Sequence, residues 1–137
     1  MTRLHVTFLI AAATLPACSD GVPRTVETQH VESPSRNFAA TIEVVDNGLG
    51  FGQGALYDEI HIGPAQHGPF SHGDKDSSVV YYAESTYGAG RSPQVEWIAA
   101  DRLRITVDPK SHPGKMSRLA SGVSIEYQTF AAGGTAP

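Results

Sequence analysis

The sequence predicts an all-β fold, a small antiparallel sandwich or open barrel of six to seven strands. Apolar and polar residues alternate at period two in several short stretches, as they do in half-buried strands. The 14 glycines and 9 prolines all lie outside those stretches, most of them where turns are expected. Behind an apolar segment at the front of the chain, no stretch carries a strong helix signal. These three observations favour many short strands over long helices.

Six stretches predict strands: residues 38–45, 55–62, 78–84, 94–98, 102–107 and 123–127. The first is typical, because alternate residues give it one apolar face, made of Phe38, Ala40, Ile42 and Val44. A weaker alternating patch, Val26, Thr28 and Val31, predicts a marginal seventh strand near the front.

The second predicted strand, 55–62, has an apolar side and a polar side. Its apolar side holds Leu56, Ile60 and Ile62, together with one charged residue, Asp58. Its polar side holds Tyr57, Glu59 and His61, which we expect to face outward. The adjacent carboxylates of Asp58 and Glu59 therefore point to opposite faces, which argues against a catalytic pair.

The connecting segments divide the chain into parts. Residues 63–77, 85–93 and 108–120 are predicted loops, and residues 131–137 a disordered tail. Residues 35–130 then form a single β-rich domain, preceded by a polar spacer at 18–34. Removing residues 1–17 leaves about 120 residues, enough for one domain with its own core.

The front of the chain has the order of a secretory signal peptide, predicted over residues 1–17. Arg3 supplies the positive end, residues 4–15 are mostly apolar, and small Ala17 follows. About a dozen helical residues rise only about 18 Å, too short to cross a bilayer comfortably.

The motif Leu15-Pro16-Ala17-Cys18 resembles the lipobox of bacterial lipoproteins. The resemblance implies that Cys18 carries a diacylglycerol and an amide-linked acyl chain such as palmitate, after cleavage of the signal before it. The chain would then be anchored to the bacterial cell envelope and face the periplasm. Ser19 mildly favours the outer membrane under the enteric sorting rule. The predicted strand order resembles that of small envelope lipoproteins without an assigned activity.

Cys18 is the only cysteine, so no internal disulfide can form and lipidation would give the thiol a role. The alternative is ordinary cleavage after Ala17, which would release a soluble protein.

Charge and motifs exclude several functions. Cleavage of the predicted signal peptide would remove Arg3, one of the 10 basic residues, and would leave 14 acidic residues in excess over the rest. Because the sequence also has no basic cluster, we expect no binding to nucleic acid. No established nucleophile or metalloprotease motif occurs, so we expect a non-enzymatic protein without a cofactor.

The loop carrying His67, His72 and Asp74 is the candidate for metal binding. Imidazoles and a carboxylate in one segment could chelate Zn²⁺ or Cu²⁺, joined by His61 or His112. The spacing matches no established ligand motif, and solvated loop histidines are the alternative.

Two glycine-bearing segments are candidates for binding an envelope protein. One spans 48–54 and presents Phe51, and the other spans 85–92 and presents Tyr87 and Arg91. The second is faintly similar to the Ser/Gly/Ala-rich loop of periplasmic lysozyme inhibitors. The alternative is that both are plain connections between strands.

Overall fold

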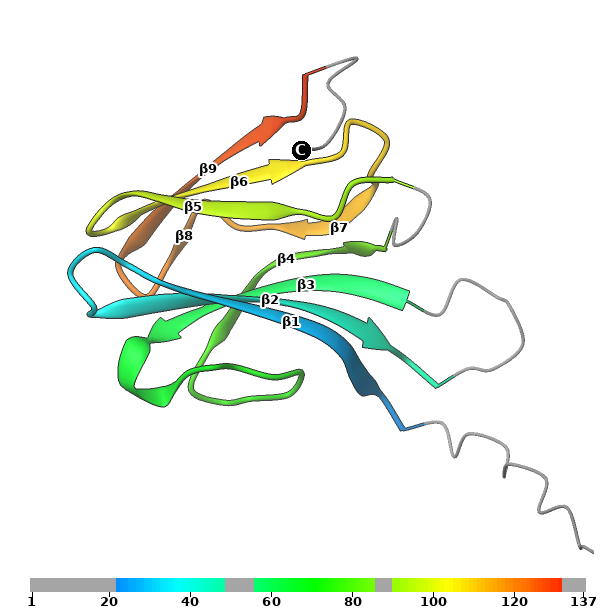
Figure 1. Ribbon diagram of the computed structural model, residues 1–137, viewed down its shortest axis with the longest axis horizontal. Helices are drawn as coiled ribbons and strands as arrows, with labels where there is room; N and C mark the ends of the chain where they lie inside the picture. Colours follow the sequence, from blue (N-terminus) through cyan, green and yellow to red (C-terminus); the bar gives the residue numbers. More distant parts are fainter. Residues whose placement is uncertain (1–21, 49–55, 86–89, 132–137) are drawn as a thin grey trace, which may run out of the picture.

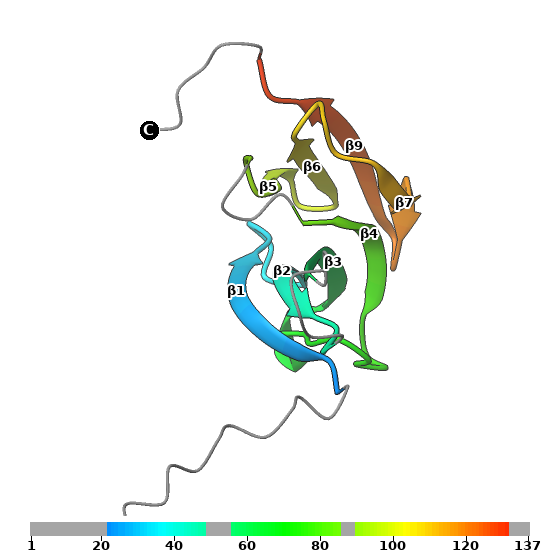
Figure 2. The same ribbon diagram turned by 90° about the vertical axis from the view of Figure 1, so that its right-hand side faces the viewer.

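Two β-sheets lie face to face in the computed structural model, which describes residues 22–48, 56–85 and 90–131 (Figure 1). Sheet A has the order β1-β2-β3-β4-β7, and sheet B the order β5-β6-β9-β8. The strands of sheet A are β1 (Arg24–Glu32), β2 (Phe38–Asp46), β3 (Leu56–Pro64), β4 (Ser78–Glu84) and β7 (Pro113–Met116). Those of sheet B are β5 (Gln94–Ala99), β6 (Arg102–Val107), β8 (Leu119–Ala120) and β9 (Val123–Thr129). The predicted all-β sandwich is confirmed, and Figure 2 shows its two layers from the side.

The structure contains the marginal seventh strand, β1, and two strands that the sequence did not predict, β7 and β8. β1 contains the marginal patch at Val26 and lies within the segment 18–34 that we expected to be a spacer. β7 and β8 lie inside the predicted loop 108–120. Neither could be recognised from alternation, because β7 is exposed along its whole length and β8 has two residues.

One pairing in sheet B is parallel, whereas the sequence predicts an antiparallel arrangement. β6 and β9 run side by side in parallel from Arg102↔Ser124 to Val107↔Thr129. Parallel neighbours need a long crossover. Residues 108–122 form this crossover. They first join sheet A as β7 and then return to sheet B as β8, so that β9 runs parallel to β6.

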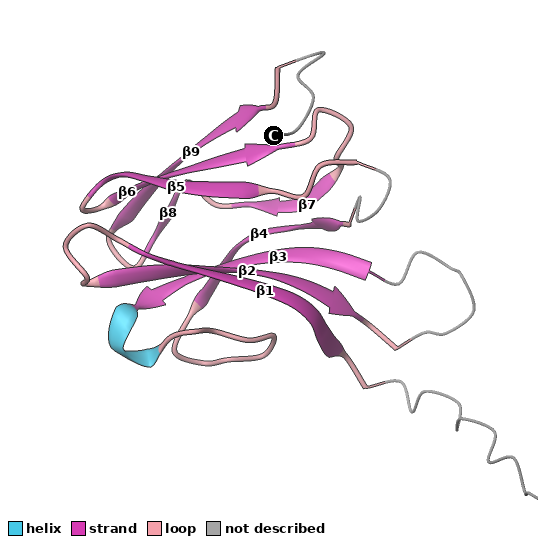
Figure 3. Cartoon of the chain, in the orientation of Figure 1, coloured by secondary structure: helices cyan, strands magenta, loops and turns pink. Residues whose placement is uncertain are grey.

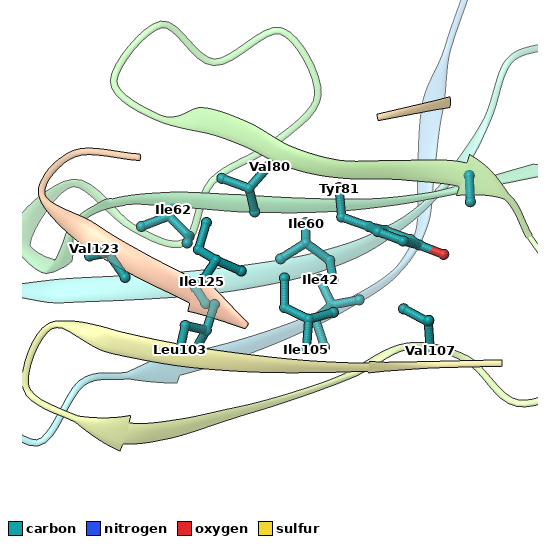
Figure 4. Packing of buried hydrophobic residues seen from close by; sticks show 12 residues of the cluster. Ile42, Ile60, Ile62, Val80, Tyr81, Leu103, Ile105, Val107, Val123 and Ile125 are labelled. Atoms are coloured by element: carbon teal, nitrogen blue, oxygen red, sulfur yellow. The ribbon is translucent and has the colours of Figure 1, made fainter. Parts of the chain in front are cut away.

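The core fills the space between the two sheets (Figure 4). The predicted inward residues Ile42, Ile60 and Ile62 of sheet A are buried there. Sheet B contributes Leu103, Ile105, Val107, Val123 and Ile125. The period-two alternation therefore identified the core faces of the long strands correctly.

Hydrogen bonds from two large side chains tie the layers together. The Trp97 indole N–H on β5 donates to the carbonyl of Val31 on β1 at 3.0 Å. On the other side, the Tyr127 hydroxyl of β9 lies 3.0 Å from the Val80 carbonyl and 2.9 Å from the Ser117 carbonyl. Burial raises the pKa of Tyr127 to about 12, so the phenol remains a donor at neutral pH.

Asp58 is the charged residue that the sequence places on the inward side of β3. It is buried, and its carboxylate accepts a 2.7 Å hydrogen bond from the Ser85 hydroxyl. Burial raises the pKa of Asp58, and the bond from Ser85 opposes that shift. The hydrogen bond from Ser85 thus compensates part of the cost of burying the Asp58 carboxylate.

Candidate metal centre

The β3–β4 connection covers the outer side of sheet A. Residues 65–77, called here the cover loop, begin with a short helical turn, η1 (Ala65–His67), and lie on the side of sheet A away from sheet B (Figure 3). The Phe70 side chain is fully buried, and its backbone N–H donates to Thr41 Oγ1 at 3.1 Å. A Cβ on Gly63 would stand 2.6 Å from the Phe70 ring, so glycine allows this close approach. The outward positions of β2 and β3 are consequently buried.

Three ionisable side chains lie under this cover: Glu43, Glu59 and His61, called here the Glu–His cluster. Glu43 on β2 is the direct partner of Glu59 on β3, and His61 follows two residues later on the same face. Their exposed fractions are 1%, 4% and 1%. Like charges placed directly opposite in a sheet are destabilising. Burying an ion also costs several kcal/mol. A cation bound between the two carboxylates would offset both of these costs.

The ligand atoms of the three side chains converge on one point. His61 Nε2 lies 3.2 Å from Glu59 Oε2 and 3.4 Å from Glu43 Oε2, and all three lie within 4.8 Å of one another. Among the described residues, Glu43 Oε2 and His61 Nε2 have no hydrogen-bond partner. Buried polar atoms almost always have one. Two carboxylate oxygens and an imidazole nitrogen thus face one another at ion-pair distance.

The spacing of these atoms fits a tetrahedral metal ion. With metal–ligand bonds of about 2.0–2.1 Å, two ligands of a tetrahedral zinc ion lie about 3.3–3.4 Å apart. The two distances from His61 Nε2 match that separation. The three protein ligands would leave one further position of the tetrahedron to be filled.

Hydrogen bonds to neighbouring residues hold the same three side chains. Thr25 on β1 donates to Glu43 Oε1 at 2.9 Å. His61 Nδ1 lies 3.1 Å from Ser77 Oγ at the end of the cover loop. His72 Nδ1 lies 3.0 Å from both oxygens of Glu59. Partners of this kind orient ligands and commonly contribute 10–100-fold to metal affinity.

The Glu59 carboxyl is kept ionised. Burial by itself would raise its pKa, but the interactions with His61 and His72 outweigh burial and lower it. A carboxylate must be deprotonated to bind a metal ion. The cluster therefore presents Glu59 in its ligand form at neutral pH.

The three predicted metal ligands of the cover loop are not brought together. His67 Nδ1 lies 3.7 Å from Asp76 Oδ2, and Asp74 Oδ1 accepts a 3.1 Å hydrogen bond from the Asp76 backbone N–H. His72 alone reaches the cluster, through Glu59. Within the described part of the chain, the one group of three side chains with metal-ligand geometry is the Glu–His cluster.

The other predicted site residues lie elsewhere. Cys18, Phe51 and Tyr87 are outside the described residues. Arg91 packs its guanidinium 5.1 Å from the centre of the Phe130 ring, and its backbone N–H donates to Asp108 Oδ2 at 3.2 Å.

Sequence reasoning missed Glu43 and treated Glu59 as an outward, solvated residue. The available signal was that Glu43, Glu59 and His61 occupy polar-face positions of two successive strands. A loop containing Phe70 follows at once, and a phenylalanine in a polar loop suggests that the loop packs against something.

No protein-family model, curated protein or solved structure matches this chain. Among the described residues, no helix is both long and apolar enough to cross a membrane.

Proposed function

We propose that this protein binds one divalent transition-metal ion of the Zn²⁺ class at the Glu–His cluster. The observation that supports this is the convergence of Glu43 Oε2, Glu59 Oε2 and His61 Nε2, three buried atoms of metal-ligating types. An ion at that point would neutralise the opposed carboxylates and give the unpaired atoms a ligand bond.

The ligand types favour a transition metal over Ca²⁺ or Mg²⁺. Ca²⁺ takes six to eight oxygen ligands, and Mg²⁺ prefers octahedral oxygen coordination with several waters. The cluster offers a few carboxylate oxygens and an imidazole nitrogen, in a space with almost no solvent contact. Imidazole with carboxylate suits Zn²⁺ and its neighbours in the first transition row.

Burial of the ligands supports binding over catalysis. Glu43 and His61 are each 1% exposed, so a substrate would have no route to the ion. Catalytic zinc sites instead keep one position open to substrate.

Titration calorimetry of the full chain with Zn²⁺ tests this function. We expect one ion per chain with a submicromolar Kd. Glu43→Gln should weaken binding at least about 100-fold, because it removes a charged ligand. In the presence of a chelator, the same variant should unfold with a free energy about 1 kcal/mol higher than wild type, because one of two opposed carboxylates is gone.

The matched control is Asp74→Asn, which alters a carboxylate that bonds within its own turn and should leave Zn²⁺ affinity unchanged. Binding weaker than micromolar in the wild type would overturn the proposal. The cluster would then be a buried ion-pair network that holds no metal ion.

The same proposal places the domain in the bacterial cell envelope, anchored to the membrane through a lipidated Cys18. Support comes from the Leu15-Pro16-Ala17-Cys18 motif and from the absence of another cysteine. Cys18→Ala should move the protein from the membrane fraction to the soluble fraction of cells that express the full chain. Retention as firm as wild type would contradict the anchor. An envelope protein partner bound through Phe51, Tyr87 or Arg91, including a lysozyme, stays a prediction from the sequence.

A further inference from the structure

His72 of the cover loop joins the Glu–His cluster to the solvent-exposed surface. Its side chain is 48% exposed, while that of Glu59, which it touches, is 5% exposed and that of His61 is 1% exposed. His72 Nδ1 stands 3.0 Å from both Glu59 oxygens, so the imidazole sits between that carboxylate and water.

The cover loop is fastened on both sides of His72. Before it, Phe70 is buried against Gly63 and its N–H is bonded to Thr41. Gly68 packs against the His30 ring of β1, and a Cβ on Gly68 would stand only 2.6 Å from that ring. After it, Ser77 Oγ is 3.1 Å from His61 Nδ1. The loop as a whole is therefore held down, and within the loop His72 contacts the cluster with a side chain that is about half exposed.

From this arrangement we infer that His72 is a positioning residue that controls the exchange of the bound ion, which passes by its side chain without opening of the cover loop. This inference rests on the proposed metal-binding function. While His72 holds Glu59, it fixes the carboxylate toward the ion and covers the path to water. When it swings outward, Glu59 is released and the ion can leave.

Metal release from the full chain tests this role. The protein, purified in detergent and loaded with Co²⁺, is mixed with excess chelator in a stopped-flow instrument, and the decay of the Co²⁺ absorption gives the release rate. We expect His72→Ala to release the ion at least 10-fold faster than wild type. His72→Asn should restore part of the slow release, because its amide N–H can occupy the place of Nδ1 and donate to Glu59.

His67→Ala is the matched control. His67 is on the same loop and is 44% exposed, but it pairs with Asp76 and not with the cluster. Its release rate should equal that of wild type.

The outcomes separate the two proposals. If the wild type fails to bind Co²⁺ or Zn²⁺, the proposed function is wrong. If the wild type binds but His72→Ala releases the ion at the wild-type rate, the function stands and the role of His72 is wrong. Equal acceleration by His67→Ala would also overturn that role, because it would point to loosening of the whole loop.

Discussion

Phe70→Ala is expected to destabilise the protein by about 3–5 kcal/mol, the usual cost of deleting a buried aromatic ring. The ring is fully buried between the cover loop and sheet A, close against Gly63. Its loss would leave a cavity and free the middle of the loop. Zn²⁺ affinity should also fall by about 10-fold, because His72 and Ser77 would no longer be held beside their partners. Denaturant unfolding with and without Zn²⁺ measures both effects.

Phe70→Leu is the control for this prediction. It retains most of the buried apolar volume and should cost about 1 kcal/mol, with Zn²⁺ affinity nearly unchanged. A loss below about 1 kcal/mol for Phe70→Ala would mean that the loop is not packed on sheet A, which would remove the burial on which the metal site depends.

Leu103→Ala should cost about 2–5 kcal/mol, because Leu103 is fully buried on β6, between β5 and the parallel strand β9. Leu119 provides a matched control on β8 of the same sheet, since it is the same residue with 68% exposure. Leu119→Ala should change the free energy of unfolding by no more than about 0.5 kcal/mol. Similar losses in the two variants would contradict the core described between the sheets.

The long strands were predictable because each pairs an apolar face with a polar one. β2 shows this, with Phe38, Ile42 and Val44 on the face that the alternation indicated. β7 was not predictable, because Pro113 and Gly114 carry no strand pattern and all four of its residues are exposed. Its place in sheet A follows from the path of the chain and from the available edge of β4.

The candidate site was predictable only in part. The sequence pointed to the loop holding His72 and mentioned His61 as a further ligand. It did not connect either residue with Glu43, because register between strands decides which outward residues are neighbours. Glu43 meets Glu59 only in the β2–β3 register that the structure shows.

The sequence by itself determined the class of fold and the core faces of the long strands, and its motif ending at Cys18 predicts export. These are local properties, since alternation and short motifs are written in neighbouring residues. Tertiary structure alone decided the parallel pairing of β6 with β9 and the burial of the Glu–His cluster. Both depend on segments far apart in the chain, and a polar residue on an outward face is solvated or buried according to what packs over it. Here the cover loop packs over it, anchored by Phe70, and converts three ordinary surface positions into a candidate metal centre.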